Sequence, residues 1–322
     1  MPKVSIITPC YNAAAYVDAT IDSAQAQTLH DWEMVIVDDG STDDSAGVVR
    51  ARTAGEPRLH LICKPNGGVS SARNTGYRWC TSEGRSPGEY LLFLDSDDVM
   101  EPTMLETMAN HLDTHSDVGL VYCRPRLIGV DGVFLEATPE SVGWAPRYAP
   151  TPLWVRRMTS EAIPTPFTTL FAPTTIIPSV SLIRSSVYAD TPGFDEPFGH
   201  LFEDLDLFLQ IALRSQVHHL PKPLLRYRRH PTQSTSNIDK VHSQEQKMYA
   251  KWQALLPSLP PEQARLVKAG FQFRNGRIAA RDGFAAAGRH LRRGEWVPAA
   301  RFAGGALRRY LPTIFSPPSA EI

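Results

Sequence analysis

The chain has 322 residues, of which 42% are hydrophobic and 21% are charged, proportions that are ordinary for a globular protein. Its formal net charge of −1 provides no overall basic field that would favour nucleic acid as a partner. The four cysteines form no C-x-x-C pair, so the usual zinc and redox motifs are absent. Three of them, Cys10 being the exception, fall in predicted strands or on a predicted helix, where small buried thiols in a reducing compartment explain them. No apolar run approaches the roughly 18 residues of a transmembrane helix, and the N-terminus leaves no room for a signal peptide. We therefore expect a cytoplasmic protein that could still lie on a membrane surface.

Strand patterns and helix patterns alternate over the first 124 residues. The expected strands cover residues 4–7, 33–37, 59–62, 91–94 and 118–122, with a loop over 8–12 and helices between the strands. This alternation predicts a mostly parallel sheet with helices on both faces. In such sheets ligands bind at the carboxyl ends of the strands, where residues 8–11, 38–39 and 95–98 all lie.

The strongest of these polar clusters is Asp95-Ser96-Asp97-Asp98, which directly follows the apolar run 91–94. Three carboxylates behind a buried strand require a positive partner. Asp-x-Asp suits a hard divalent cation, which prefers oxygen ligands and could hold the phosphates of a ligand. The alternative is a helix-capping turn, because Asp and Ser are good N-caps and Pro102 follows. Three acidic residues together favour the metal.

The second half of the chain is less regular. Residues 125–176 are rich in proline and predict strand-and-loop excursions that face a second substrate, and regular structure returns over 179–188. A helix over residues 202–213 begins with Glu203, Asp204 and Asp206. These carboxylates are either helix-start charges favoured by the macrodipole or include a general base. Residues 223–230 predict an edge strand that ends in a basic cluster.

The last part of the chain is predicted to be helical, over residues 240–256, 261–291 and 296–311. Basic and large apolar residues alternate there: Arg289, Arg292, Arg293, Arg301, Arg308 and Arg309 with Trp296, Phe302, Leu307 and Tyr310. The pattern fits a helical appendage with one packed and one solvated face, which we favour, or an amphipathic surface for anionic lipid.

Six ordered segments resemble those of family 2 glycosyltransferases, which have the GT-A fold, use nucleotide-sugars and invert the anomeric centre. They are VSIITPCYN (4–12), VIVDDGSTD (35–43), NGGVSSARNTG (66–76), LFLDSDD (92–98), GFDE…FEDLDL (193–207) and YRRH (227–230). The resemblance covers about residues 3–236. It implies an α/β, Rossmann-like GT-A domain over 1–236, with a nucleotide-sugar half (1–124) and an acceptor half (125–236). Residues 237–322 would be a helical C-terminal extension.

The resemblance also implies roles for individual residues on the donor side. Thr8, Pro9, Tyr11 and Asp39 would line the nucleotide pocket, with Tyr11 stacking on the base and Asp39 accepting a hydrogen bond from its ring N–H. Arg73 would face the diphosphate or the base, and the Gly67-Gly68 turn before it offers N–H groups that attract anions. That turn has neither a P-loop nor a dinucleotide fingerprint. The remaining nucleotide-sugar residues would be Asp95 at the ribose, Ser96 and His230.

Metal and catalytic roles follow from the same resemblance. Asp97, with Asp95, would bind Mn²⁺ or Mg²⁺, and Asp204 would be the catalytic base, with Glu203 as the next choice. Leu205 and Gln210 stand where the family often has an aromatic residue and an arginine, so the resemblance does not identify the acceptor.

The expected function is therefore transfer of a sugar from a UDP-sugar to a hydroxyl of a glycan or lipid-linked acceptor in surface polysaccharide synthesis. The expected location is the cytoplasm or the cytoplasmic face of the inner membrane, with peripheral contact through the basic helices. Two alternatives are a degenerate domain that serves as a nucleotide-binding or scaffold module and a sugar-phosphate nucleotidyltransferase. The latter would need a glycine-rich, basic loop after the first strand.

Overall fold

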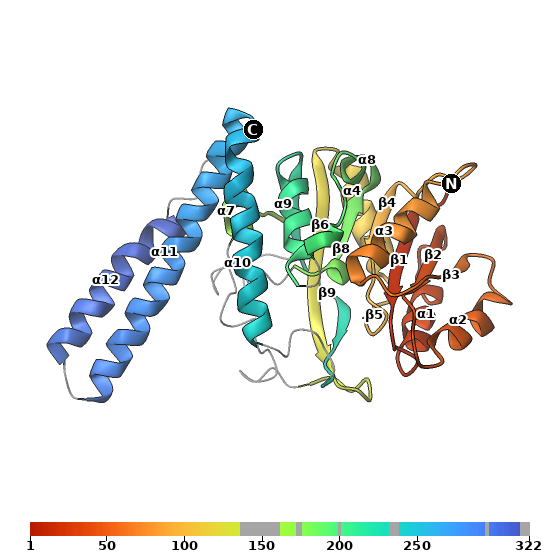
Figure 1. The fold of residues 1–322 in the computed structure, drawn as a ribbon, viewed down its shortest axis with the longest axis horizontal. Coiled ribbons are helices and arrows are strands. Elements are labelled where there is room, and N and C mark those ends of the chain that lie inside the picture. The colour runs from red at the N-terminus through yellow and green to blue at the C-terminus, as the bar shows by residue number, and fades with distance from the viewer. Residues whose placement is uncertain (136–161, 172–175, 199–200, 232–237, 294–295, 316–322) are drawn as a thin grey trace. The chain divides into compact units, whose positions relative to one another are not determined.

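The protein is described by a computed structural model over residues 1–135, 162–171, 176–198, 201–231, 238–293 and 296–315. Its central feature in the described residues is a nine-stranded sheet of order β3-β2-β1-β4-β8-β6-β9-β5, with β7 also paired to β9 (Figure 1). The strands are β1 (Val4–Cys10), β2 (Trp32–Asp38), β3 (Leu59–Cys63), β4 (Tyr90–Phe93), β5 (Val99–Met100), β6 (Val118–Ile128), β7 (Ile163–Pro164), β8 (Ser181–Arg184) and β9 (Gln216–Arg228).

The sheet is mostly parallel, as predicted. Strands β3, β2, β1 and β4 are parallel to one another, and β6 is parallel to β9. Strand β8 runs antiparallel to β4 and β6, and the short β5 and β7 run antiparallel to β9. The long strands form because their apolar runs are buried on both faces; every residue of β1 and β4 is buried.

Helices pack on this sheet through small or apolar residues. They are α1 (Val17–Gln25), α2 (Ser45–Thr53), α3 (Val69–Cys80), α4 (Met104–Thr114), α8 (Ser185–Ala189) and α9 (Glu203–Ala212). Helix α3 lies on β1 and β2, and Gly76 permits this approach because a Cβ there would lie 2.4 Å from Ile7 Cγ2. The close approach brings the N-terminal half of α3, with Arg73, to the carboxyl ends of the strands.

Two sequence expectations are wrong. The predicted loop from Thr8 is strand as far as Cys10, which pairs with β2. Pro9 is accommodated because its nitrogen faces the β4 side, where the pairing of β1 with β4 stops at Ile7; a proline can occupy a strand where no ladder donor is needed. The predicted edge strand, β9, lies between β6 and the short strands β5 and β7. The sequence makes β9 an edge strand because its neighbours β5 and β7 have two residues each, too few to show a periodic pattern.

The chain forms two compact units. Of the described residues, unit 1 contains 1–135, 162–164, 176–198, 201–231 and 238–251, and unit 2 contains 165–171, 252–293 and 296–315. Helix α10 (Ile238–Leu255) belongs to unit 1 through Lys251, whereas the sequence places the domain boundary at 236–237, and that division stays a prediction. The irregular stretch predicted for 125–176 falls mainly on 136–161 and 172–175, outside the described residues.

Unit 2 is helical in its described part. It contains α7 (Phe167–Leu170), α11 (Pro261–Arg292) and α12 (Trp296–Phe315). Phe171 packs against the ring of Phe271 at a centroid distance of 5.0 Å and lies over Gly270, where a Cβ would come within 2.3 Å of its ring. The helices predicted over 261–291 and 296–311 are therefore present as α11 and α12, and among the described helices none is long and apolar enough to cross a membrane.

Candidate functional site

The site lies where three parallel strands of unit 1 end. Strands β1, β2 and β4 end at Cys10, Asp38 and Phe93, and the segments that leave them carry the polar clusters singled out in the sequence. Adjacent parallel strands place their carboxyl ends at one edge of the sheet, so these clusters share that edge.

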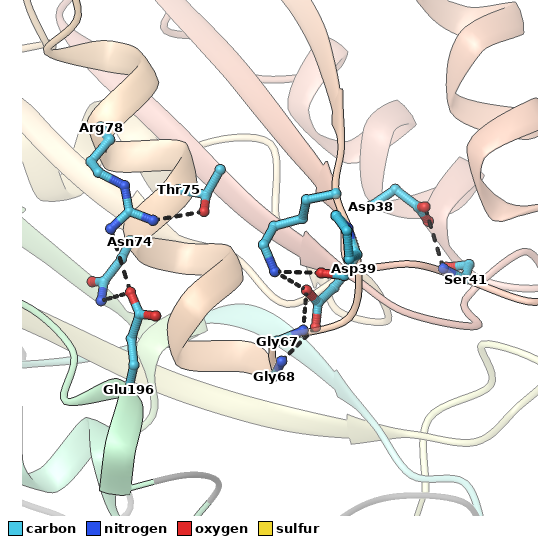
Figure 2. A network of polar contacts seen from close by, with 11 residues as sticks. Asp38, Asp39, Ser41, Gly67, Gly68, Asn74, Thr75, Arg78 and Glu196 are labelled. Carbon is cyan, nitrogen blue, oxygen red and sulfur yellow. Dashed lines mark hydrogen bonds and ion pairs between the residues drawn. The ribbon is translucent and has the colours of Figure 1, made fainter.

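Asp39 is held by the turn that begins α3. Its carboxylate accepts hydrogen bonds from the N–H groups of Gly67 at 3.0 Å and Gly68 at 2.8 Å, and from Lys64 Nζ at 2.5 Å (Figure 2). Gly68 has φ +86°, a conformation in which glycine is unstrained. The sequence predicts N–H groups open to an anion; they do bind an anion, but it is the chain's own Asp39.

The turn before α2 is fixed in a similar way. Asp38 accepts the N–H of Ser41 at 3.3 Å (Figure 2), and Gly40 has φ +74° with its Cα so close to Asn66 that a Cβ would lie 2.8 Å from that backbone nitrogen. The contacts of Asp38 and Gly40 thus define the backbone on both sides of the buried Asp39.

Arg73 connects the acidic segment after β4 to the start of α9. Only 3% of its side chain is exposed, and its guanidinium donates to Asp95 Oδ1 at 2.8 Å and to Glu203 Oε1 at 2.9 Å. Burial lowers the pKa of Arg73, but Asp95 and Glu203 outweigh it, so that the pKa is raised and the side chain stays charged. Burial also raises the pKa of Asp95, and Arg73 opposes this. Two motifs separated by more than a hundred residues are therefore joined by one buried cation.

The rest of the acidic segment is anchored to the end of β9. His230 Nε2 lies 2.8 Å from Asp97 Oδ2, and the His230 ring packs 5.1 Å from the Tyr16 ring. Arg228 donates its backbone N–H to the buried Asp98 at 3.1 Å and its Nε to the carbonyl of Asp97 at 2.9 Å. The YRRH motif thus supports this segment on one side.

Negative charge accumulates around Asp97. Burial, and then the charges of Asp97 and Asp95, raise the pKa of Asp98 well above its ordinary value. In the described part of the chain no group of three or more His, Cys, Asp or Glu residues could hold a metal ion by itself. A magnesium-type ion is commonly held by one or two carboxylates together with substrate phosphates and water. Asp97 is 24% exposed and fits that role, with the partly exposed Asp95 beside it.

The first turn of α9 carries the candidate base. Leu201 and Phe202, which precede it, have φ values of +78° and +67°, each at a cost of about 1–3 kcal/mol that the surroundings must offset. Glu203 is buried and bound to Arg73, whereas Asp204 is partly exposed and accepts the N–H of Leu205 at 2.7 Å. Burial, and then the charge of Glu203, raise the pKa of Asp204 to about 7.

The other predicted residues differ in accessibility. Thr8 and Pro9 are buried within β1, and Ser96 is buried with its carbonyl accepting the hydroxyl of Thr20 at 3.0 Å. Tyr11 is 51% exposed, so its ring is available to a ligand. Lys64 and Arg228 were not singled out from the sequence. Arg228 could have been noticed because it belongs to the YRRH motif, whereas nothing local marks Lys64 as the partner of Asp39.

Known proteins resemble this chain in sequence and in structure. The model of the family "Glycosyl transferase family 2" matches residues 5–172. The chondroitin synthase of Escherichia coli is 28% identical over 222 residues, which are 69% of this chain but only 28% of that protein's length.

Two solved structures have the same fold. Residues 1–349 of S. aureus TarS, in complex with UDP, superpose with a TM-score of 0.56 at 16% identity, over 95% of this chain and 91% of that one. The mannosyltransferase PcManGT of Pyrobaculum calidifontis, in complex with GDP-Man and Mn²⁺, gives a TM-score of 0.58 at 18% identity, over 98% of this chain and 87% of that one. These likenesses confirm the predicted GT-A type of α/β fold. Because the family model matches more than half of the sequence, the chain belongs to glycosyltransferase family 2.

Proposed function

We propose that this chain is an inverting, metal-dependent glycosyltransferase that moves a sugar from a UDP-sugar to a hydroxyl of a glycan or lipid-linked acceptor in surface polysaccharide synthesis. The observation that carries the proposal is the bridge from Arg73 to Asp95 and Glu203. It joins the acidic segment 95–98, where the nucleotide-sugar would bind, to the turn of α9 that bears Asp204. One buried cation therefore supports both the proposed donor site and the proposed base.

The proposed chemistry assigns a task to each part of the site. Transfer develops positive character at the anomeric carbon and negative charge on the leaving phosphate. A divalent cation at Asp97 and Asp95 would supply Lewis-acid stabilisation of that charge. Asp204 accepts the proton of the acceptor hydroxyl as the new bond forms, and a single displacement inverts the anomeric centre. A pKa of about 7 suits a base that works near neutral pH.

The proposed nucleotide pocket uses Thr8, Pro9, Tyr11, Asp39, Arg73, Ser96 and His230. Tyr11 stacks on the base through its exposed ring. Asp39 already binds Gly67, Gly68 and Lys64, yet a carboxylate offers about four acceptor sites, so one more hydrogen bond from the base is possible. TarS has been solved with UDP and PcManGT with GDP-Man and Mn²⁺; these ligands support a nucleotide donor and a divalent cation for this chain as well. The likeness to a chondroitin synthase supports a role in polysaccharide synthesis.

Calorimetric titration with UDP, GDP, CDP and dTDP, each with and without Mn²⁺, tests the proposal. We expect UDP to bind in the presence of Mn²⁺ at least tenfold more tightly than the other three, by about 1.4 kcal/mol. If another nucleoside diphosphate binds most tightly, the proposed donor changes, but the proposed reaction class stays the same. If no nucleotide binds, the transferase proposal fails and a scaffold module becomes the better explanation.

We also propose that the chain acts at the cytoplasmic face of the inner membrane through its C-terminal helices. In unit 2, Trp296, Val297 and Phe302 are 72%, 81% and 44% exposed. Four exposed arginines lie near them in the sequence: Arg292, Arg293, Arg301 and Arg308. Exposed aromatic side chains and arginines together suit an interface with anionic lipid.

Liposome flotation checks this surface. The wild type is expected to float with vesicles that contain anionic lipid and not with neutral ones. Neutralising the four arginines to glutamine should reduce the floated fraction at least tenfold, because each basic residue near an anionic surface contributes about 1 kcal/mol. The matched control neutralises four exposed basic residues of unit 1: Arg50, Arg85, Arg214 and Lys222. If the unit 2 variant and the unit 1 control float equally, the proposed lipid-binding surface of the C-terminal helices is excluded.

A further inference from the structure

Lys251 of α10 binds two carboxylates that belong to different segments of unit 1. Its Nζ lies 2.6 Å from Asp195 Oδ2 and 2.8 Å from Asp206 Oδ2. Asp206, in α9, is only 1% exposed, and a buried carboxylate requires a positive partner. Burial lowers the pKa of Lys251, but Asp206 and then Asp195 outweigh it, so that the pKa is raised and the ammonium group stays charged.

Asp195 belongs to a loop that is itself attached to α3. Asn74 donates Nδ2 to the carbonyl of Phe194 at 2.8 Å and accepts the Phe194 N–H at 3.1 Å. The same Nδ2 donates to Glu196 at 2.9 Å (Figure 2). Lys251 therefore ties α9 to a loop that α3 already holds.

The first turn of α9 is thus held twice. Glu203 is bound by Arg73 of α3, and Asp206 is bound by Lys251 of α10. Residues three apart lie on one face of a helix, so these two contacts hold the face of the turn that carries Glu203 and Asp206. Asp204 lies between them in the sequence and is not on that face. The left-handed backbone at Leu201 and Phe202 persists only where surrounding contacts over-determine it.

We propose that Lys251 is a positioning residue for the catalytic turn: by binding Asp206 and Asp195 it fixes the orientation of Asp204 toward the acceptor hydroxyl. The inference rests on the proposed function of Asp204. It places a required part of the catalytic unit in α10, beyond the last motif of the family resemblance at residue 230. A misplacement of about 1 Å can lower a rate about 100-fold, so the contact matters for turnover more than for donor binding, which the strand ends provide.

Lys251→Met, Lys251→Arg and Lys247→Met test the proposal in the full chain. Lys247 is an exposed lysine of the same helix, about one turn away, and serves as the matched control. With release of UDP from a UDP-sugar as the assay, Lys251→Met is expected to lower kcat at least tenfold and to change the donor KM less than twofold. Lys251→Arg should recover most of kcat, because a guanidinium keeps the charge and can donate to both carboxylates. Lys247→Met should match the wild type.

Hydrogen–deuterium exchange supplies a readout that does not depend on turnover. In Lys251→Met, exchange should rise in residues 201–207 and stay at the wild-type level in α3. If Lys251→Met unfolds the protein, the double variant Lys251→Met, Asp206→Asn removes the charge of the buried carboxylate that has lost its lysine partner and is used in its place. Wild-type kcat in Lys251→Met, or a loss that Lys251→Arg does not restore, would overturn the proposal. Unchanged exchange in 201–207 would overturn it as well. A wild type that binds no nucleotide and releases no UDP would instead refute the proposed function.

Discussion

Asp204→Asn should lower kcat between about a hundredfold and ten-thousandfold, the usual contribution of a positioned general base. The substitution keeps the size of the side chain and removes its ability to accept a proton. Binding of UDP with Mn²⁺ should change less than twofold, because the proposed donor contacts lie at the strand ends. Steady-state kinetics and calorimetry on the same preparation separate the two effects.

The pH dependence of kcat/KM gives an independent check on the same residue. Asp204 is a base only when it is ionised, and its pKa is about 7. In the wild type, kcat/KM should therefore fall tenfold for each pH unit below about 7 and reach a plateau above it. Glu203→Gln should move this limb to lower pH, because Glu203 contributes to raising the pKa of Asp204 and Arg73 would then act on Asp204 with less compensation.

Asp22→Asn is a suitable control for these measurements. Asp22 is exposed in α1, where Asp18 also pairs with Arg52, so the loss of one partner should leave kcat unchanged. An Asp204→Asn variant that keeps more than a tenth of the wild-type kcat would exclude Asp204 as the base. If kcat/KM of Asp204→Asn still falls below pH about 7 as in the wild type, the group that titrates is not Asp204.

Asp97→Asn should abolish the Mn²⁺-dependent part of UDP binding. Loss of a residue that only supports a metal ligand commonly costs 10- to 100-fold in metal affinity, so loss of the ligand itself should cost at least about 100-fold. Calorimetric titration of UDP with and without Mn²⁺ measures the effect directly. Asp95→Asn would be less informative, because Asp95 also binds Arg73 and its loss would disturb Glu203.

The stability of Asp97→Asn distinguishes loss of the metal from misfolding. Asp97 raises the pKa of the buried Asp98, because the charge of Asp97 disfavours ionisation of that carboxyl. The asparagine removes this unfavourable charge and keeps an oxygen beside His230, so Tm should change little. Asp22→Asn is again the control, with unchanged binding and nearly unchanged Tm. Mn²⁺-dependent binding that survives in Asp97→Asn would move the proposed metal site elsewhere.

Several parts of the fold could be predicted from the sequence because their signal is local. The apolar runs of β1, β2 and β4 indicate buried strands, and the helical spacing of Ala72, Gly76 and Cys80 indicates α3, in which all three are buried. The three helices after residue 237 were recognisable in the same way. The two-residue strands β5 and β7 could not be predicted, since a strand of that length has no periodicity and exists only because β9 lies beside it.

The candidate site also has features that local sequence predicts and features that only tertiary contacts determine. Sequence alone determined which residues follow the parallel strands, and hence that Asp39, Asp95 and Asp97 lie at one edge of the sheet. Tertiary structure decided their partners: Gly67 and Gly68 for Asp39, Arg73 for both Asp95 and Glu203, and Lys251 for Asp206. A strand or helix is encoded by neighbours a few positions apart, whereas Arg73 and Glu203 are separated by 130 residues. Such a pair forms only when the packed sheet brings the two segments together, so it has no signature in either segment alone.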